Sequence, residues 1–356
     1  YTYNTLGSMI CVQQGSQDRY FMYDSLGRTL RIRQPEQEVN TSLNTSGNPD
    51  NNSWTGGFTY DNNGNVLTTT DAKGTTITNT YDALNRALTR TYSDGTPTVT
   101  NYYDGEGLLA VPDHSKGKLT KVASSVSESK YTEFDLLGRL KESQQVTDGN
   151  TYTSKYTYNL SGALVEEEYP SGRKVQNILD NNGDLSIVQS KKNAGSGYWH
   201  YADGFSYTAA GGVTKMQLGN GLWETAQFNT RQQVTQLGLG IVATDTSHWK
   251  IDYEFGELQT NGTVDATKNT GNIGKQTLTV PGTNFVQAYK YDPLDRLTEA
   301  KETTSTTQNW IQQFGYDRYG NRTSFSKTIG STTTTSTPSI DASTNRFSGS
   351  QGFTYD

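Results

Sequence analysis

The side chains best suited to acid–base or metal chemistry are few and scattered in this sequence. It holds three histidines, His114, His200 and His248, and one cysteine, Cys11. No histidine has a second His or Cys at metal-site spacing, and a zinc or Ser-His-Asp site needs partners that the chain barely supplies. We therefore predict no catalytic residue, no metal and no cofactor, and the single cysteine excludes an internal disulfide.

Two Asp-Asn-Asn-Gly segments, at residues 61–65 and 180–184, resemble the start of a calcium-binding loop. An EF-hand requires Glu at its twelfth position, where this chain has Ala72 and Lys191. An Asn-Gly turn is the simpler interpretation, and a weak calcium site of another type is the alternative.

The segment VEEEYP, at residues 165–170, gathers three carboxylates. In a strand, Glu166 and Glu168 would face one side and Glu167 the other. This pattern favours a solvated edge over a glycosidase pair, which needs two carboxyls facing one cleft.

Tryptophans are the candidate ligand-binding residues. The segments WHYADG and SHWK place Trp199 beside His200 and Trp249 beside His248. With Trp223, these rings are possible stacking surfaces for sugars. The alternative is that they are ordinary half-exposed strand residues.

The elements that position these residues come from a repeat. A heptad starts with an aromatic residue, usually followed by Asp or Asn, and has a turn residue in fifth place and usually an apolar residue in seventh. A dozen copies, mostly 20–37 residues apart, start at Tyr3, Tyr23, Tyr60, Tyr81, Tyr103, Phe134, Tyr158, Leu179, Tyr207, Phe228, Tyr291 and Tyr316. A period of this length with elastic insertions is typical of repeat architectures.

Each heptad predicts a β-hairpin. Asp or Asn initiates turns, and glycine adopts positive φ at little steric cost. The fifth place holds the predicted turn glycines, which are Gly7, Gly27, Gly64, Gly107, Gly138, Gly162, Gly183, Gly211 and Gly320. Asn85, Asp295 and Gln232 replace glycine in other copies, and Gln232 fits this interpretation worst. Arg in sixth place can pair with the Asp of its own or a neighbouring copy.

Composition supports an all-β repeat protein. Hydrophobic residues make up 31% of the 356 residues, too few for an ordinary globule of this size, whereas 11% aromatic residues and regular turns argue against disorder. We expect residues 1–356 to form a single array of antiparallel hairpins joined into one long curved or spiralling sheet. Irregular insertions are expected near 35–57, 241–274 and 328–345, as long loops, poorly matching copies or binding loops.

Charge and hydropathy limit the partners. The net charge of −6 without a basic stripe argues against nucleic acid, and no apolar run approaches the length of a membrane span.

The segments FMYDSLGRTLRI (21–32), YTEFDLLGRLKE (131–142), YKYDPLDRLTEA (289–300) and FGYDRYGNRTS (314–324) resemble the YD repeat of the Rhs family. This family includes bacterial polymorphic toxins, the C component of insecticidal toxin complexes and teneurins. The resemblance implies a β-sheet that spirals into a hollow shell around a C-terminal toxic domain. The Asp-bearing segment that frees the cargo in the toxins has no counterpart here, so no catalytic residue is carried over. Because about a dozen copies are too few to close a full shell, an open or incomplete shell is expected.

Two functions follow from this sequence. The first is a non-catalytic shell module, part of a longer secreted or surface bacterial protein, that encapsulates or presents a C-terminal cargo domain. The second is a cell-surface adhesion or carbohydrate-binding module that recognises surface glycans. An enzyme such as a polysaccharide hydrolase is the least favoured interpretation.

Overall fold

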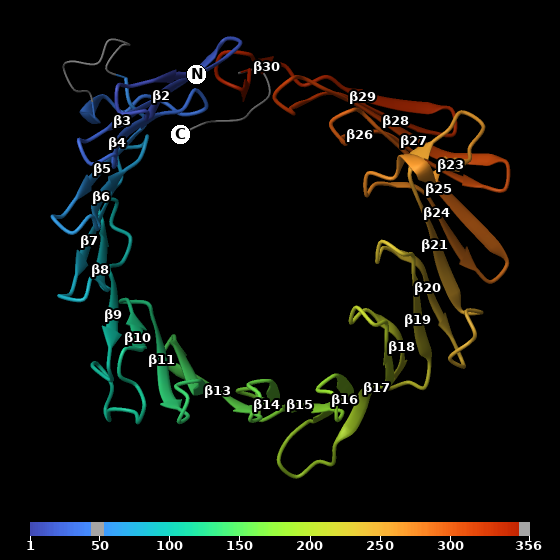
Figure 1. Cartoon of the computed structure of the whole chain (residues 1–356), viewed down its shortest axis with the longest axis horizontal. Coiled ribbons are helices and arrows are strands. Elements are labelled where there is room, and N and C mark those ends of the chain that lie inside the picture. The colour runs from blue at the N-terminus through green and yellow to red at the C-terminus, as the bar shows by residue number, and fades with distance from the viewer. Residues whose placement is uncertain (44–52, 349–356) are drawn as a thin grey trace. The chain divides into compact units, whose positions relative to one another are not determined.

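The computed structural model describes residues 1–43 and 53–348, which are almost entirely strands and tight turns. Twenty-seven strands of these residues belong to one antiparallel sheet, in which strands that follow one another in the chain generally pair (Figure 1). Two short ribbons and two single-turn 3₁₀ helices, Thr41–Leu43 and Ala266–Lys268, complete the structure. The predicted all-β fold of joined hairpins is confirmed. No helix among the described residues is long and apolar enough to cross a membrane.

The chain divides into two compact units. Unit 1 comprises residues 1–155 together with the C-terminal residues from 339 onward. Its array strands are β1 (Thr2–Tyr3), β2 (Met9–Gln14), β3 (Gln17–Tyr23), β4 (Thr29–Arg33), β5 (Gly56–Tyr60), β6 (Val66–Thr70), β7 (Thr76–Tyr81), β8 (Ala87–Tyr92), β9 (Val99–Tyr103), β10 (Leu119–Ala123), β11 (Ser127–Phe134) and β12 (Leu140–Thr147). The ribbon β30 (Ile340–Asp341) and β31 (Arg346–Phe347) also belongs to unit 1.

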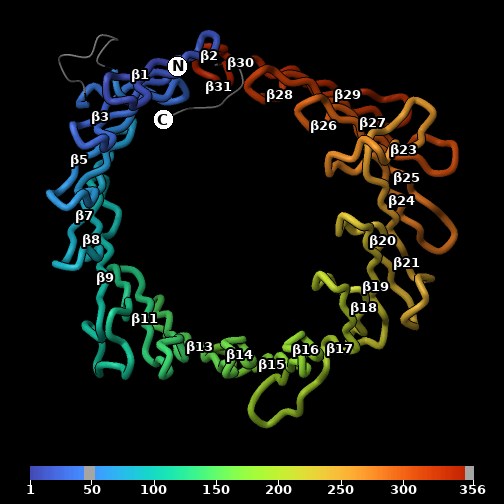
Figure 2. The backbone as a smooth tube through the Cα atoms, in the orientation of Figure 1, coloured from blue at the N-terminus to red at the C-terminus, as the bar shows by residue number. Residues whose placement is uncertain are grey.

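Unit 2 comprises residues 156–338, and β13 (Asn150–Tyr158) runs into it from unit 1. Its further array strands are β14 (Leu164–Glu168), β15 (Lys174–Leu179), β16 (Leu185–Lys191), β17 (Trp199–Tyr207), β18 (Val213–Leu218), β19 (Trp223–Phe228), β20 (Val234–Gly240), β21 (Trp249–Phe255), β24 (Ile273–Val280), β25 (Thr283–Tyr291), β26 (Leu297–Thr304), β27 (Thr307–Tyr316), β28 (Arg322–Ile329) and β29 (Thr332–Ser336). The ribbon β22 (Glu257–Leu258) and β23 (Val264–Asp265) stands outside the array, so that β21 pairs with β24. Figure 2 traces the backbone through the successive reversals of each unit.

The heptad sets the strand ends. In all twelve copies a strand ends on the first residue of the heptad, and in eleven the next strand begins on the seventh. The exception is the copy at Tyr103, where the apolar residue in seventh place, Leu109, does not begin a strand, contrary to the hairpin that the heptad predicts. That residue is fully exposed, and β10 begins only at Leu119 because a longer loop occupies residues 104–118.

The predicted insertions are more regular than the sequence suggested. Residues 241–274 contain β21, a full member of the array, and residues 328–345 contain the turn and second strand of the β28–β29 hairpin. In the first insertion, whose residues 44–52 lie outside the described part, Trp54 is 1% exposed and Leu43 is buried. Most other side chains are half-buried, so this insertion contributes some of the best-buried packing in unit 1.

Candidate functional site

The repeated turn is built around one carboxylate. In the copy at Tyr23, Oδ1 of Asp24 accepts hydrogen bonds from the backbone N–H groups of Leu26 and Arg28, each at 2.9 Å. Its Oδ2 accepts from Nε of Arg28 at 2.6 Å. The backbone closes the same turn, since the N–H of Gly27 donates to the carbonyl of Asp24 at 3.1 Å. The side chain thus satisfies turn donors that the backbone alone would leave free.

The same arrangement recurs in the other Asp-Arg copies. The own-copy ion pairs Arg86–Asp82, Arg139–Asp135 and Arg296–Asp292 span 2.6–2.7 Å. The pKa of Asp82 lies below its usual value chiefly because the backbone N–H of Arg86 donates to its carboxylate, with the Arg86 side chain adding to the effect against partial desolvation. In the copies with Asn in sixth place, Asn65 and Asn321 donate to Asp61 and Asp317 at 2.8 Å.

All nine predicted turn glycines have positive φ, between 72° and 96°. In eight of them the N–H donates to the carbonyl of the second heptad residue; Gly107 instead lies in the longer loop after β9. The replacements Asn85, Gln232 and Asp295 adopt φ of 61°, 60° and 59°, so all three take the left-handed conformation that glycine takes elsewhere.

The tyrosine hydroxyls form a contact that the sequence analysis missed. In seven copies the hydroxyl donates to a backbone carbonyl at the start of the preceding hairpin's second strand. The bonds are Tyr23–Met9, Tyr60–Thr29, Tyr81–Val66, Tyr103–Ala87, Tyr207–Leu185, Tyr291–Ile273 and Tyr316–Leu297, at 2.6–3.1 Å. We call this series the tyrosine ladder. The available signal was that nine of the twelve heptads start with Tyr and only two with Phe.

The sixth-place arginines also reach the next copy. Arg28 lies over the ring of Tyr60 at 4.7 Å and donates to the carbonyl of Asp61 at 3.1 Å. Arg296 repeats both contacts, with Tyr316 at 4.8 Å and the carbonyl of Asp317 at 2.8 Å. Pairing with the Asp of the own copy and of the neighbouring copy, which the sequence left as alternatives, occurs together at Arg86, whose Nη1 lies 3.0 Å from the carboxylate of Asp104.

The three candidate tryptophans do not form one stacking surface. Trp223 lies opposite Gly240 and Trp249 opposite Leu239, which are successive residues of β20, so their side chains leave opposite faces of the sheet. The ring of Trp223 covers Gly204, where an added Cβ would lie 2.8 Å from it. Trp199 is different, because it is 75% exposed at the start of β17.

The other residues with possible chemistry are occupied by local contacts. Nδ1 of His200 and Oδ2 of Asp203 are 2.7 Å apart at an exposed position. Glu166 and Glu168 both pair with Lys174, as expected for one strand face, whereas Glu167 accepts from the hydroxyl of Tyr169. Within residues 1–43 and 53–348 there is no group of three or more His, Cys, Asp or Glu that could hold a metal.

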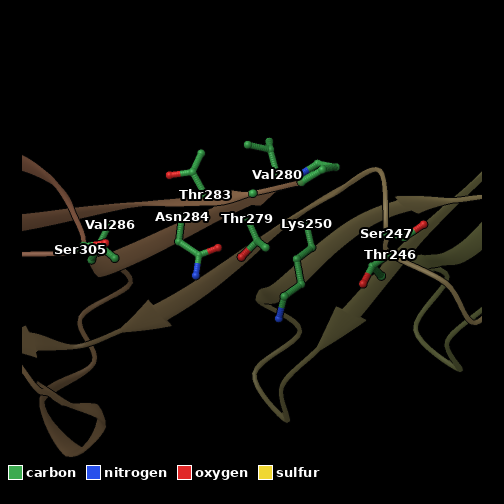
Figure 3. A pocket seen from close by; sticks show the side chains of 11 residues that line it. Thr246, Ser247, Lys250, Thr279, Val280, Thr283, Asn284, Val286 and Ser305 are labelled. Carbon is green, nitrogen blue, oxygen red and sulfur yellow. The ribbon is translucent and has the colours of Figure 1, made fainter.

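A polar groove of about 680 Å³ lies in unit 2 (Figure 3). Its floor includes a cross-strand row, Lys250, Thr279 and Asn284, from β21, β24 and β25. Nζ of Lys250 is paired with Asp252 at 2.8 Å. The groove therefore offers hydroxyl and amide hydrogen bonds, and no nucleophile lies beside a base.

A second hollow, of about 440 Å³, lies where the β22–β23 ribbon meets β25. Tyr289 and Tyr291 line it, together with the ion pair of Lys268 and Glu257 at 2.5 Å. Burial, with smaller contributions from neighbouring Tyr and Glu groups, raises the pKa of Tyr289 to about 12.

Comparisons with known proteins agree with this architecture. Residues 60–97 match the model of the RHS repeat. No curated protein sequence matches the chain.

Solved structures share the fold over nearly the whole chain. The crystal structure of TcdB2-TccC3 without its hypervariable C-terminal region matches 92% of this chain with a TM-score of 0.73 at 16% identity. The crystal structure of TcdB2-TccC3-Cdc42 matches 92% of this chain with a TM-score of 0.74 at 16% identity. The Photorhabdus luminescens Tc holotoxin pore matches 93% of this chain with a TM-score of 0.62 at 16% identity. This chain spans only 17–18% of the length of those chains. The repeat match over residues 60–97 and the shared fold together confirm the predicted resemblance to the Rhs/YD-repeat family.

Proposed function

We propose that this chain is a non-catalytic structural segment of a β-sheet shell, within a longer secreted or surface toxin-like protein, that encloses or presents a cargo domain. The observation that carries the proposal is the tyrosine ladder. In seven of the twelve copies it bonds a hairpin to the one before it, and together with the strand pairing it makes the array a wall whose stability is a sum of neighbour contacts.

The likeness to the Tc toxin structures supports the same proposal, since one of them is described as lacking a hypervariable C-terminal region. The side chains also favour a passive role. The carboxylates of the turns are bound to backbone N–H groups and arginines rather than facing a cleft.

Protease protection tests this function. The longest natural chain that carries these residues is digested, and the survival of the segment C-terminal to the array is followed over time. We expect Tyr60→Phe with Tyr81→Phe to shorten that survival, because both substitutions loosen the wall without removing a ring. Tyr152→Phe, in an exposed strand position, is the control. Equal cleavage of that segment in all chains would refute enclosure.

Carbohydrate binding is the second candidate, and Trp199 is the observation that favours it. A Trp with three quarters of its surface exposed, beside the half-exposed Tyr201, is suited to stacking on a sugar ring. Arg173 lies over the ring of Tyr201 at 5.2 Å, which adds a donor near the patch.

A glycan array with the intact chain tests this candidate. Binding that is lost in Trp199→Ala and kept in Trp223→Phe would support a surface glycan as partner. Absence of binding to any glycan would leave the shell function alone.

A further inference from the structure

The C-terminal ribbon, residues 339–348, lies within unit 1, against residues from the start of the chain. The ribbon is shaped by its own turn. Oδ1 of Asp341 accepts from the backbone N–H groups of Ser343 and Thr344 at 2.8 and 3.1 Å, and the N–H of Asn345 donates to the carbonyl of Asp341. The ribbon is therefore a locally organised element and not a loose tail.

The first anchor is at the β2–β3 turn. Oγ of Ser16 and Nε2 of Gln17 both donate to the carbonyl of Ala342, at 2.9 and 3.1 Å. These partners are more than 300 residues apart in the chain. Gln17 is completely buried, so the loss of this acceptor would leave a shielded amide without its partner.

The second anchor is Arg346. Its Nε donates to the carbonyl of Glu36 at 2.7 Å, and its Nη1 pairs with the carboxylate of Glu38. The Arg346 side chain is only 11% exposed, and Arg19 pairs with the carboxylate of Glu36 beside it. Positive charge on the ribbon thus meets backbone and carboxylate oxygens on the segment after β4.

Strand pairing supports the β2–β3 hairpin through β1 at Met9 and Cys11 and through β4 at residues 20–23. In a repeat array each hairpin depends on its neighbours, and backbone that no neighbour covers opens most readily. The turn between β2 and β3 lies beyond both pairings, and the ribbon contacts the hairpin there.

We propose that the surface formed by Ser16, Gln17 and residues 36–38 is a docking site for the C-terminal ribbon of the same chain, and that the docked ribbon acts as a clasp that protects the β2–β3 hairpin from opening. The clasp can be released without unfolding the array, because its anchors are a few polar contacts. This inference goes beyond the proposed shell function and does not depend on a cargo.

Amide hydrogen exchange in the full chain tests the clasp. Arg346→Ala is expected to accelerate exchange in β2 and β3 about tenfold or more, because charge-assisted bonds are lost. Arg346→Lys keeps the charge near Glu38 but not the Nε bond, and should give an intermediate rate. Arg231→Ala is the matched control, since Arg231 donates to the carbonyl of Asn269 at 2.7 Å within unit 2. Unchanged exchange in Arg346→Ala, or an equal change in the control, would overturn the proposal.

A covalent trap tests the docking itself. Ser16→Cys with Ala342→Cys places two thiols on residues that contact each other, since Oγ of Ser16 donates to the backbone carbonyl of Ala342 at 2.9 Å. We expect oxidation to give a cross-link within one chain, identified by peptide mass, and slower exchange in β2–β3. Ser16→Cys alone controls for reaction with Cys11. No cross-link, or cross-links only between two chains, would show that the ribbon does not dock on its own chain.

Discussion

Replacing Tyr60 with Phe isolates one bond of the tyrosine ladder. The hydroxyl of Tyr60 donates to the carbonyl of Thr29 at 2.7 Å, across 31 residues of chain. Partial burial of this hydroxyl raises the pKa of Tyr60, in keeping with a group shielded from water. The substitution keeps the ring and its contact with Arg28 at 4.7 Å, so that only the donor is removed.

The substitution is expected to lower the free energy of local opening by about 1–2 kcal/mol. This figure combines the net contribution of one hydrogen bond with the penalty for a shielded carbonyl left without its donor. That cost corresponds to a roughly 5- to 30-fold change in the local opening equilibrium. Because repeat arrays do not always unfold in one step, global melting is the wrong measurement. Amide exchange resolved to peptides from β4, β5 and β6 measures the opening directly.

Tyr152→Phe is the matched control, because Tyr152 is 48% exposed in β13. Removing its hydroxyl should not change the rate of amide exchange. A double substitution with Arg28→Ala would separate the stacking contact from the hydrogen bond. If Tyr60→Phe and Tyr152→Phe exchanged alike, the ladder would not hold hairpins together and the argument for a continuous wall would fail.

Three further outcomes are expected. Gln232→Gly should raise the free energy of unfolding by about 0.5–1 kcal/mol, because Gln232 has a φ of 60°, which glycine adopts more easily. Gly27→Ala should lower it by about 1 kcal/mol, because alanine is strained at the positive φ of Gly27. Chemical denaturation measures both changes. The array should lose stability as the pH falls below about 4, because the pKa of turn carboxylates such as Asp82 is lower in the folded state than the usual 3.8. The ionised carboxylate therefore stabilises the fold above pH 3.8, and this stabilisation is lost when the carboxylate is protonated. Asp82→Asn should weaken this acid dependence in a circular dichroism titration. Tyr289 should ionise near pH 12, because burial in the fold favours its protonated hydroxyl. The fold should therefore keep its full stability below pH 10 and lose part of it as the pH rises towards 12. Ultraviolet titration of Tyr289→Phe should lack this late ionisation step.

The sequence alone determined where the strands end. Turn chemistry is local, because a second-place Asp such as Asp24 binds the backbone of the four residues that follow it and a fifth-place Gly such as Gly27 takes positive φ. The heptad could therefore be interpreted without knowing which strand lies beside which. The copy at Tyr103 shows the limit of this reasoning, since a matching heptad there is followed by a loop and not by a strand.

The tertiary structure decided what joins the hairpins. The acceptor of each of the seven ladder hydroxyls lies 14–31 residues away and is a backbone carbonyl, which no residue pattern marks. The burial of Trp54 in an expected irregular insertion, and the docking of Arg346 on Glu36 across more than 300 residues, depend on how distant segments meet. Local preferences fix the turns of this protein, whereas contacts between segments far apart in the chain appear only once the sheet has brought them together.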